Sequence, residues 1–259
     1  MFDRHAKGVR LTEVGQMFVR RVEFFQSELR RAREEIDQKK GILTGEVSIA
    51  LSPVTCMSVM PPAIARFTKR YPEALVKVKE SLFQPIETDL ANGSIDFWIG
   101  PFDRSGASPQ FVAERLLDNE RWVVGRKGHP LSSARSLHEL ADAKWVRPAI
   151  SVQGAESDFD SAFALAGLPL PKKVIHSGSL LISIVTVANT DLLTVMPRHL
   201  FQFSPLSRLV QAFEFIEPMP AAPICIVRRQ GLYLTPMAEH LSDLMRNAAR
   251  NYARRTAAS

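Results

Sequence analysis

Small hydroxyl-bearing residues follow several apolar segments, and these are the residues whose types and spacing could do chemistry. The segment EVSIALS ends at Ser52, and Pro53 and Thr55 follow it before a helical pattern begins. Hydroxyl groups and free backbone N–H groups at a strand-to-helix junction suit a carboxylate or sulfonate. A second set follows later apolar segments and comprises Ala149, Ser151 and Thr194. The sequence therefore predicts an anion site, although Ser52 and Ser151 could instead only cap helices.

Catalytic chemistry has no comparable set of residues. The sequence contains no HExxH or GxSxG motif, no P-loop and no GxGxxG after a strand. Its histidines are scattered, and Asp158 and Asp160 lie two residues apart, which points them to different faces of a helix. Cys56 and Cys225 stand far apart in apolar segments, as buried thiols in a reducing compartment do. We therefore expect no enzyme activity, no metal site and no cofactor.

Length and composition indicate a folded chain of two domains. Hydrophobic residues make up 46% of the 259 residues and charged residues 23%, which excludes a disordered or fibrous chain. A chain of this length can bury two modest cores. No apolar run reaches the roughly 20 residues that cross a bilayer, and the start lacks the apolar core of a signal peptide. We expect a cytoplasmic protein with no membrane partner.

One long helix is predicted over residues 12–42. Thr12 can cap its start, and Gly41 follows two lysines at its end. Apolar residues recur every three or four positions, which is the seam by which one helix pairs with another. This seam comprises Val14, Phe18, Val22, Phe25, Leu29, Ala32 and Ile36. We expect it to form a homo-oligomer interface, and a helix lying on its own globule is the alternative.

Beyond Gly45, strand-like and helix-like patterns alternate, which is typical of an α/β fold. Strands are predicted at EVSIALS, ALVKVKE and IDFWIGP, and helices over 59–70 and 85–92. Strands joined by helices pair in parallel. A second series has strands in 121–130, 145–147 and 192–197 and helices over 159–166 and 180–188, before a strand at ICIVRR and a helix over 236–252. We therefore predict two α/β lobes: residues 46–116 and 219–259 form lobe I, and residues 117–218 form lobe II.

The ordered series of motifs resembles the LysR-type transcriptional regulators over essentially the whole chain. The start resembles the wing of the family's winged helix-turn-helix and its linker helix, at Phe2, Arg4, Lys7, Gly8, Leu11, Thr12 and Gly15. Two later landmarks are matched by Pro61, Pro62, Phe67, Tyr71 and Pro72, and by Gly93, Ile95, Asp96, Ile99, Gly100 and Pro101. GHPL and DLLTVMPRHL complete the series, and the latter, with IVRRQGLYLTPMAEHL, also resembles the branch that includes the toluenesulfonate regulator.

The resemblance implies a two-lobed effector domain of the type-two periplasmic-binding-protein fold, preceded by the linker helix and a remnant of a winged helix over residues 1–11. In that fold the ligand binds between the lobes at the carboxyl ends of strands. The effector would be a small anion, such as an aromatic carboxylate or sulfonate. Its expected contacts are Ser52, Pro53, Thr55, Phe102, Ala149, Ser151 and Thr194. Phe102 could wall the pocket with its ring, but plain core packing is an equal alternative.

The resemblance also implies promoter DNA as a partner of the full-length form. A winged helix-turn-helix of this family needs about 45 to 50 further residues before Phe2. Arg4, Lys7 and Thr12 would contribute only phosphate or minor-groove contacts, which position a protein but read little sequence. We therefore expect this chain not to recognise an operator. A solute-binding protein of the same fold is the alternative function, and a signal peptide would favour it.

Overall fold

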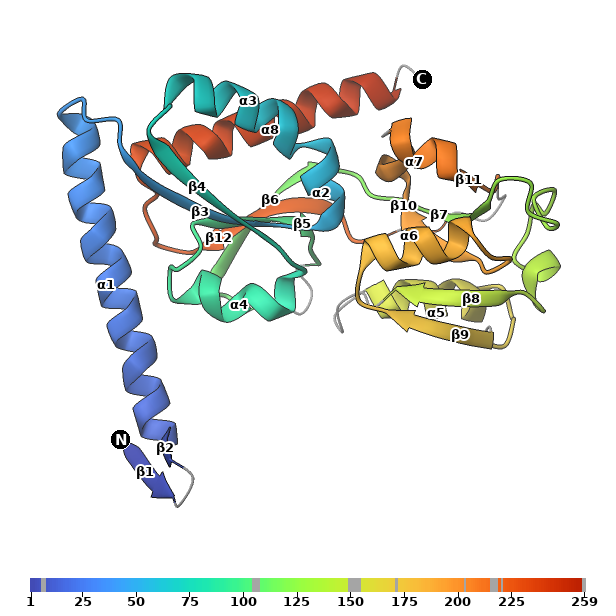
Figure 1. Cartoon of the computed structure of the whole chain (residues 1–259), viewed down its shortest axis with the longest axis horizontal. Coiled ribbons are helices and arrows are strands. Elements are labelled where there is room, and N and C mark those ends of the chain that lie inside the picture. Colours follow the sequence, from blue (N-terminus) through green and yellow to red (C-terminus); the bar gives the residue numbers. More distant parts are fainter. Residues whose placement is uncertain are drawn as a thin grey trace.

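Two lobes lie side by side along the long axis of the molecule, and one long helix stands at the outer edge of the first (Figure 1). The computed structural model describes all residues except 6–7, 104–107, 149–154, 171, 203, 215–218, 220 and 258–259. The chain opens with an antiparallel hairpin of β1 (Phe2–His5) and β2 (Gly8–Leu11). Helix α1 (Glu13–Lys39) follows, and the side chain of Thr12 accepts a hydrogen bond from the Gly15 amide at 3.0 Å. The predicted cap therefore starts the predicted helix.

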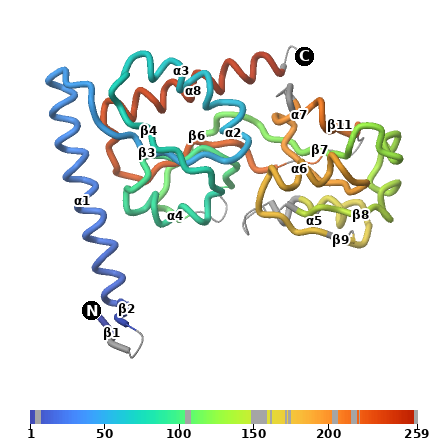
Figure 2. Tube along the Cα trace, in the orientation of Figure 1, coloured from blue at the N-terminus to red at the C-terminus, as the bar shows by residue number. Residues whose placement is uncertain are grey.

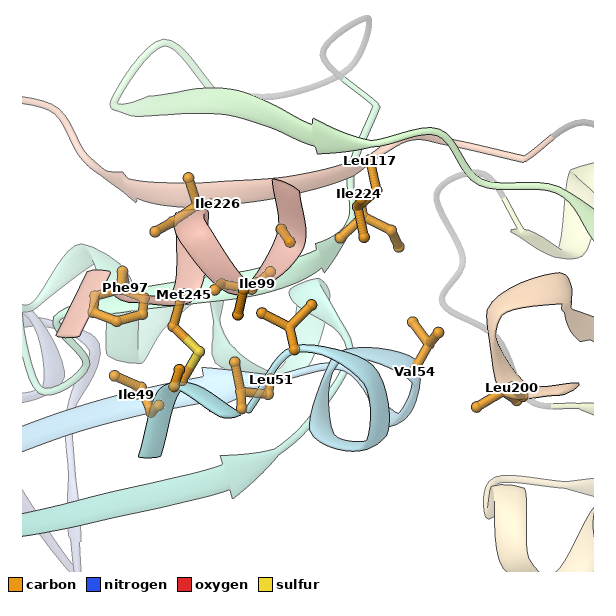
Figure 3. Packing of buried hydrophobic residues seen from close by; sticks show 14 of the residues in the cluster. Ile49, Leu51, Val54, Phe97, Ile99, Leu117, Leu200, Ile224, Ile226 and Met245 are labelled. Carbon is orange, nitrogen blue, oxygen red and sulfur yellow. The ribbon is translucent and has the colours of Figure 1, made fainter. Parts of the chain in front are cut away.

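Lobe I is a five-stranded sheet with helices on both faces. Its strand order is β4 (Ala74–Glu80), β3 (Gly45–Leu51), β5 (Phe97–Pro101), β12 (Ile224–Arg229) and β6 (Phe111–Leu117). Helices α3 (Met60–Arg70) and α8 (Pro236–Ala257) cover one face and α4 (Phe83–Ala91) the other (Figure 1). Buried aliphatic side chains from β3, β5 and β12 pack under Met245 of α8 (Figure 3).

Lobe II is built from smaller pieces. Strand β7 (Arg121–Arg126) lies between β10 (Thr194–Pro197) and β11 (Val210–Ala212) and is antiparallel to both. Strands β8 (Lys144–Pro148) and β9 (Lys172–Ser177) form a parallel pair, which a bridge from Trp145 to Leu193 joins to β10. Its helical segments are η1 (His138–Leu140), α5 (Ala155–Leu165), α6 (Leu180–Ala188), η2 (Arg198–Gln202) and α7 (Ser204–Leu209). Trp145 packs edge-on against Phe159 and Phe163 at the centre of this core.

Two segments cross between the lobes and are hydrogen-bonded to each other. The chain leaves lobe I at the end of β6 and returns to it ahead of β12 (Figure 2). Asn119 Nδ2 donates to the Ala222 carbonyl at 3.0 Å, and the Ala221 amide donates to the Asn119 carbonyl. The lobes are therefore joined by a paired hinge, and Arg121 enters β7 directly beyond it.

The α/β prediction is confirmed, with differences in detail. The expected parallel pairing holds for β3 with β4 and β5, but β12 runs antiparallel to β5 and β6, because these strands return from outside the βαβ series. The single helix predicted over 59–70 is two helices, α2 (Pro53–Ser58) and α3. Strands β6, β9 and β11 were not predicted, because their residues lack a clear alternation of apolar and polar side chains.

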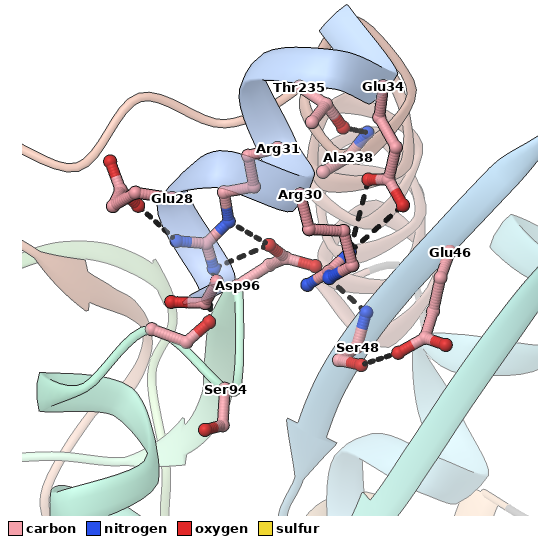
Figure 4. Close-up of polar contacts among 12 residues, drawn as sticks. Glu28, Arg30, Arg31, Glu34, Glu46, Ser48, Ser94, Asp96, Thr235 and Ala238 are labelled. Atoms are coloured by element: carbon pink, nitrogen blue, oxygen red, sulfur yellow. Dashed lines mark hydrogen bonds and ion pairs between the residues drawn. The ribbon is translucent and has the colours of Figure 1, made fainter. Parts of the chain in front are cut away.

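Helix α1 is fixed to lobe I by buried polar contacts (Figure 4). Arg31 pairs with Asp96 and also donates to the Gly93 carbonyl. Two turns earlier in α1, the Arg229 guanidinium lies 4.2 Å from the centre of the Phe24 ring. At the other end, the Met237 amide of α8 donates to Gln38 Oε1 at 3.0 Å. One side of α1 therefore faces lobe I and the other faces solvent.

Candidate functional site

A cavity of about 370 Å³ lies between the two lobes. This volume falls within the range of about 300 to 1,000 Å³ that is usual for small-molecule sites. Lobe I contributes the end of β3, the start of α2 and the loop before α4, and lobe II contributes β7, β10 and the start of α6. Val54 of α2 and Leu200 of η2 face each other across the space between the lobes (Figure 3). A ligand in this cavity would therefore touch both lobes.

The lobe I wall is set by the turn from β3 into α2. The Ser52 amide donates to the Ile99 carbonyl at 2.8 Å, which holds Ser52 at the end of the sheet. The Thr55 hydroxyl shares its proton between the carbonyls of Ile99 and Ser52, both at 2.9 Å. Because that proton is already used, Ser52 is the donor in the contact between the Ser52 and Thr55 hydroxyls. Gly100 is required beside this turn, because a Cβ there would lie 2.8 Å from the Ser52 Cβ.

The lobe II wall combines a helix start with two buried polar side chains. Ser179 caps α6 by accepting from the Ile182 amide, and the hydroxyls of Ser177 and Ser183 both donate to the Ser179 carbonyl at 3.0 Å. Thr194 and Arg121 complete the wall and are only 0% and 3% exposed. Buried polar side chains at a cavity wall indicate a polar ligand rather than a purely apolar one.

The structure brings together only part of the predicted effector site. Ser52, Pro53 and Thr194 line the cavity. Thr55 does not line it, because its hydroxyl is used within the β3–α2 turn. Phe102 does not line it either, since its ring packs 4.7 Å from Phe83 in an aromatic cluster with Trp98 and Phe111. Ala149 and Ser151 lie outside the described residues.

Several lining residues were missed by the sequence analysis. They are Arg121, Ser177, Ser179, Leu180 and Ser183. A signal existed for the helix start, because Ser177, Gly178 and Ser179 precede an apolar helix as capping residues do. Arg121 carried a weaker signal, a single charge at the start of the apolar run WVVG. Its burial follows from partners that are distant in sequence, so spacing alone could not reveal it.

The seam predicted on α1 is exposed in this single chain. Val14, Phe18, Val22, Phe25, Leu29 and Ile36 are 37% to 77% exposed, and Ala32 is exposed as well. A shallow apolar groove runs along Phe18, Val22, Phe25 and Leu29. Of the predicted DNA-contact residues, Thr12 caps α1 and Arg4 lies in β1, while Lys7 lies outside the described residues. The predicted seam is therefore an exposed apolar strip along α1.

Other chemistry has little support in the described part of the chain. Within it, no three His, Cys, Asp or Glu side chains are grouped as a metal site would need. None of its helices is long and apolar enough to cross a membrane. Both cysteines are free thiols; Cys225 is buried, whereas Cys56 is only partly buried. Burial raises the pKa of the Cys56 thiol to about 11, so this thiol is protonated and unreactive at neutral pH.

The fold and the cavity define a class: a two-lobed, ligand-binding domain of the periplasmic-binding-protein type, joined to a long helix. The chain belongs to the LysR family, because residues 40–250 match the family model described as the LysR substrate binding domain. It is 28% identical over 247 residues to the HTH-type transcriptional regulator GalR of Pseudomonas putida, covering 95% of this chain and 62% of that protein. It is 30% identical over 210 residues to GbpR of Azospirillum brasilense, covering 79% of this chain and 61% of that regulator.

The chain thus spans about six tenths of the length of these two regulators. Among solved structures, the effector-binding domain of QuiR in complex with shikimate superposes with a TM-score of 0.67 at 19% identity. That match covers 80% of this chain and 98% of the QuiR chain. The likeness establishes the fold of the domain.

Proposed function

We propose that this chain is the effector-responsive part of a LysR-type transcriptional regulator acting in the cytoplasm. A small organic anion binds in the cavity between the lobes and changes the arrangement of the lobes around the paired hinge. A ligand can shift such an equilibrium only if it binds the two arrangements differently. The observation that carries the proposal is the cavity itself, which takes hydroxyl groups from both lobes and lies beside the hinge.

Relatives and architecture support the regulatory part of the proposal. GalR and GbpR are named as transcriptional regulators, and the QuiR domain binds shikimate in the corresponding fold. In the whole protein, promoter DNA is the second partner, and the apolar seam of α1 pairs two copies of the chain. Effector binding would then alter how the paired copies contact DNA. A solute-binding protein of the same fold would have no use for that exposed seam, and we expect no catalysis.

Thermal shift with a panel of aromatic carboxylates, sulfonates and dicarboxylates tests the ligand-binding claim. A ligand at 100 times its Kd adds about 2.7 kcal/mol to the free energy of unfolding, which raises the Tm measurably. At least one anion of the panel is expected to do so.

Leu180→Glu and Leu181→Glu form a matched pair that locates the binding. Leu180 lines the cavity at the start of α6, where an acidic residue suits the helix, while Leu181 is 69% exposed and does not line it. Leu180→Glu should abolish the anion-dependent shift by repulsion, and Leu181→Glu should keep it. The proposal fails if no compound shifts the Tm, or if both variants respond as the wild type does.

A further inference from the structure

We infer that a groove between α1 and lobe I is a second ligand site, separate from the cavity between the lobes. It binds a small molecule that carries two or more negative charges on phosphate groups. Arginines from both walls of the groove hold the phosphate, and the bound molecule fixes the angle at which α1 leaves lobe I. This inference does not depend on the proposed function.

The groove lies where α1 leaves lobe I, and its volume is about 570 Å³. Arg31 fixes α1 to lobe I, and the helix continues from there toward the β1–β2 hairpin (Figure 1). The stretch beyond the fixed part supplies one wall of the groove, from residues three or four positions apart on one face: Met17, Arg20, Arg21 and Phe24. Helix α4, the residue before β6 and the end of β12 supply the other wall. A molecule in the groove therefore touches both α1 and lobe I.

The charges along the groove are mostly positive. Arg20 and Arg21 line it from α1, and Arg229 lines it from β12. Within the part of the chain that the structure describes, none of these three guanidinium groups forms an ion pair or a side-chain hydrogen bond. Glu87 of α4 is the one acid among the described lining residues. Like charges that face each other across a groove repel, and an anion between them removes that repulsion.

Arg229 is placed for anion binding by two contacts. Its backbone lies opposite Phe111 in the register of β12 with β6, and its guanidinium lies over the Phe24 ring. A guanidinium that stacks on a ring keeps the N–H groups in its own plane available, and these match the oxygens of a phosphate in pairs. Because the stack already restricts the side chain, binding an anion costs it less conformational entropy than it costs a free arginine.

Charge and size together select the class of ligand. Three arginines and one glutamate give the groove an excess of two positive charges, which a monoanion does not neutralise. A phosphate group concentrates a charge of about −1.5 to −2 and three acceptor oxygens at one point, which suits several guanidinium groups. The volume is usual for a small-molecule site, whereas a DNA duplex, whose major groove alone is about 12 Å wide, is too large to enter.

A phosphate held between Arg20 and Arg229 joins α1 to lobe I at a second place, beyond the ion pair of Arg31 with Asp96. Two separate points of attachment restrict the direction of a helix more than one does. Arg21 lines both this groove and the shallow apolar groove along the seam of α1. The ligand therefore determines how the seam projects from lobe I.

Calorimetry with inorganic pyrophosphate, at an ionic strength of about 0.15 M, tests the inference. The wild type should bind pyrophosphate at least about tenfold more tightly than the monoanion methanesulfonate. Arg20→Gln and Arg229→Gln should each weaken pyrophosphate binding by about fivefold or more, because each removes charge-assisted hydrogen bonds. Arg33→Gln is the matched control, since Arg33 is exposed on α1, does not line the groove and carries the same charge. It should bind pyrophosphate as the wild type does.

Leu180→Glu, which changes the cavity between the lobes, should leave pyrophosphate binding unchanged and so separates the two sites. Arg20 is exposed, so Arg20→Gln answers the question if Arg229→Gln does not fold. The inference is overturned if pyrophosphate does not bind, if methanesulfonate binds as tightly, or if Arg33→Gln weakens binding as much as the groove variants do. Loss of binding in Leu180→Glu would place pyrophosphate in the cavity instead. Displacement of pyrophosphate by a short DNA duplex would overturn the assignment to a small molecule.

Discussion

Arg31 of α1 and Asp96 of lobe I form a buried ion pair, with Nη2 and Oδ1 2.9 Å apart and side chains 5% and 3% exposed. The Ser48 amide donates to the other carboxylate oxygen at 2.8 Å. Burial raises the pKa of the Asp96 carboxyl above its usual value, against the opposing pull of Arg31 and the Ser48 amide. Gly93 permits this contact, because its φ is +76° and a Cβ there would lie 2.8 Å from Arg31 Nη1. The pair fixes where α1 meets lobe I.

Asp96→Asn should destabilise the protein strongly. The variant leaves Arg31 buried without its counter-charge, which typically costs about 3 to 5 kcal/mol. Urea denaturation measures the loss. Asp89→Asn is the control, since the pair of Lys79 and Asp89 is largely exposed and contributes about 1 kcal/mol at most. Equal losses in the two variants would show that the buried pair has no special role.

Thr194→Val should change stability and ligand binding in opposite directions. Valine replaces a buried hydroxyl that lacks a partner within the described structure, so the free energy of unfolding should stay the same or rise by up to about 1 kcal/mol. Affinity for benzoate should fall. Thr55→Val is the matched control, because that hydroxyl is bonded to the Ile99 carbonyl and its loss should cost about 1 to 3 kcal/mol. A lower Tm with unchanged affinity in Thr194→Val would mean that Thr194 serves the fold only.

Phe25→Glu should split the oligomer that α1 is proposed to form. Phe25 is 77% exposed at the centre of the seam, and a charge there would be buried in a helix pair. Light scattering after size exclusion gives the mass of each variant. Gln16→Glu adds the same charge at an exposed position outside the seam and should leave the mass unchanged. A wild type that is monomeric at high concentration would contradict the assignment of the seam.

Lowering the pH should decrease the free energy of unfolding, because His199, which packs between lobe II and α8, is stabilising in its neutral form. Burial and the nearby Arg198 lower the pKa of its imidazole from 6.5, while Glu120 acts to raise it. The ring lies 5.2 Å from the Tyr252 ring of α8, and its Nε2 contacts the Asp118 carbonyl at 2.7 Å. The unfolded chain therefore takes up a proton first as the pH falls, so the stabilising contribution of neutral His199 is complete above pH 6.5 and is lost below it.

His199→Gln should accordingly lose part of this pH dependence. Denaturation curves between pH 7.5 and 5.5 should show a smaller fall in the free energy of unfolding for the variant than for the wild type. His138→Gln, at a residue that is exposed on η1, controls for the removal of a histidine. Identical slopes in all three proteins would place the acid sensitivity elsewhere.

Local patterns in the sequence predicted the helices and strands, whereas contacts between distant residues determine which side chains line the cavity. The spacing of Phe18, Val22 and Phe25 indicated α1 because helix periodicity is a local property. Ser52 and Thr194 were predicted as effector contacts from their places beside apolar strands, near which ligand sites of α/β folds lie, and both line the cavity. Arg121 was missed because its place at the cavity is set by backbone pairing with Pro197 and Met219, which are distant in the sequence.

The role of Phe102 was also left open by the sequence. Its position after the Gly-Pro that ends β5 is compatible with a pocket wall or with the core. Phe83, Trp98 and Phe111 decide between these alternatives by surrounding its ring, and they come from three different elements. Only the assembled fold reveals that cluster.

A crystal structure with 4-bromobenzoate, recorded at the bromine absorption edge, tests most directly the claim that a small organic anion binds between the lobes. The strongest bromine peak should lie inside the cavity that Ser52 and Thr194 line. The apolar ring should lie toward Leu180 and Leu200. A bromine peak outside the cavity, or a cavity without bromine at a saturating concentration, would contradict the account.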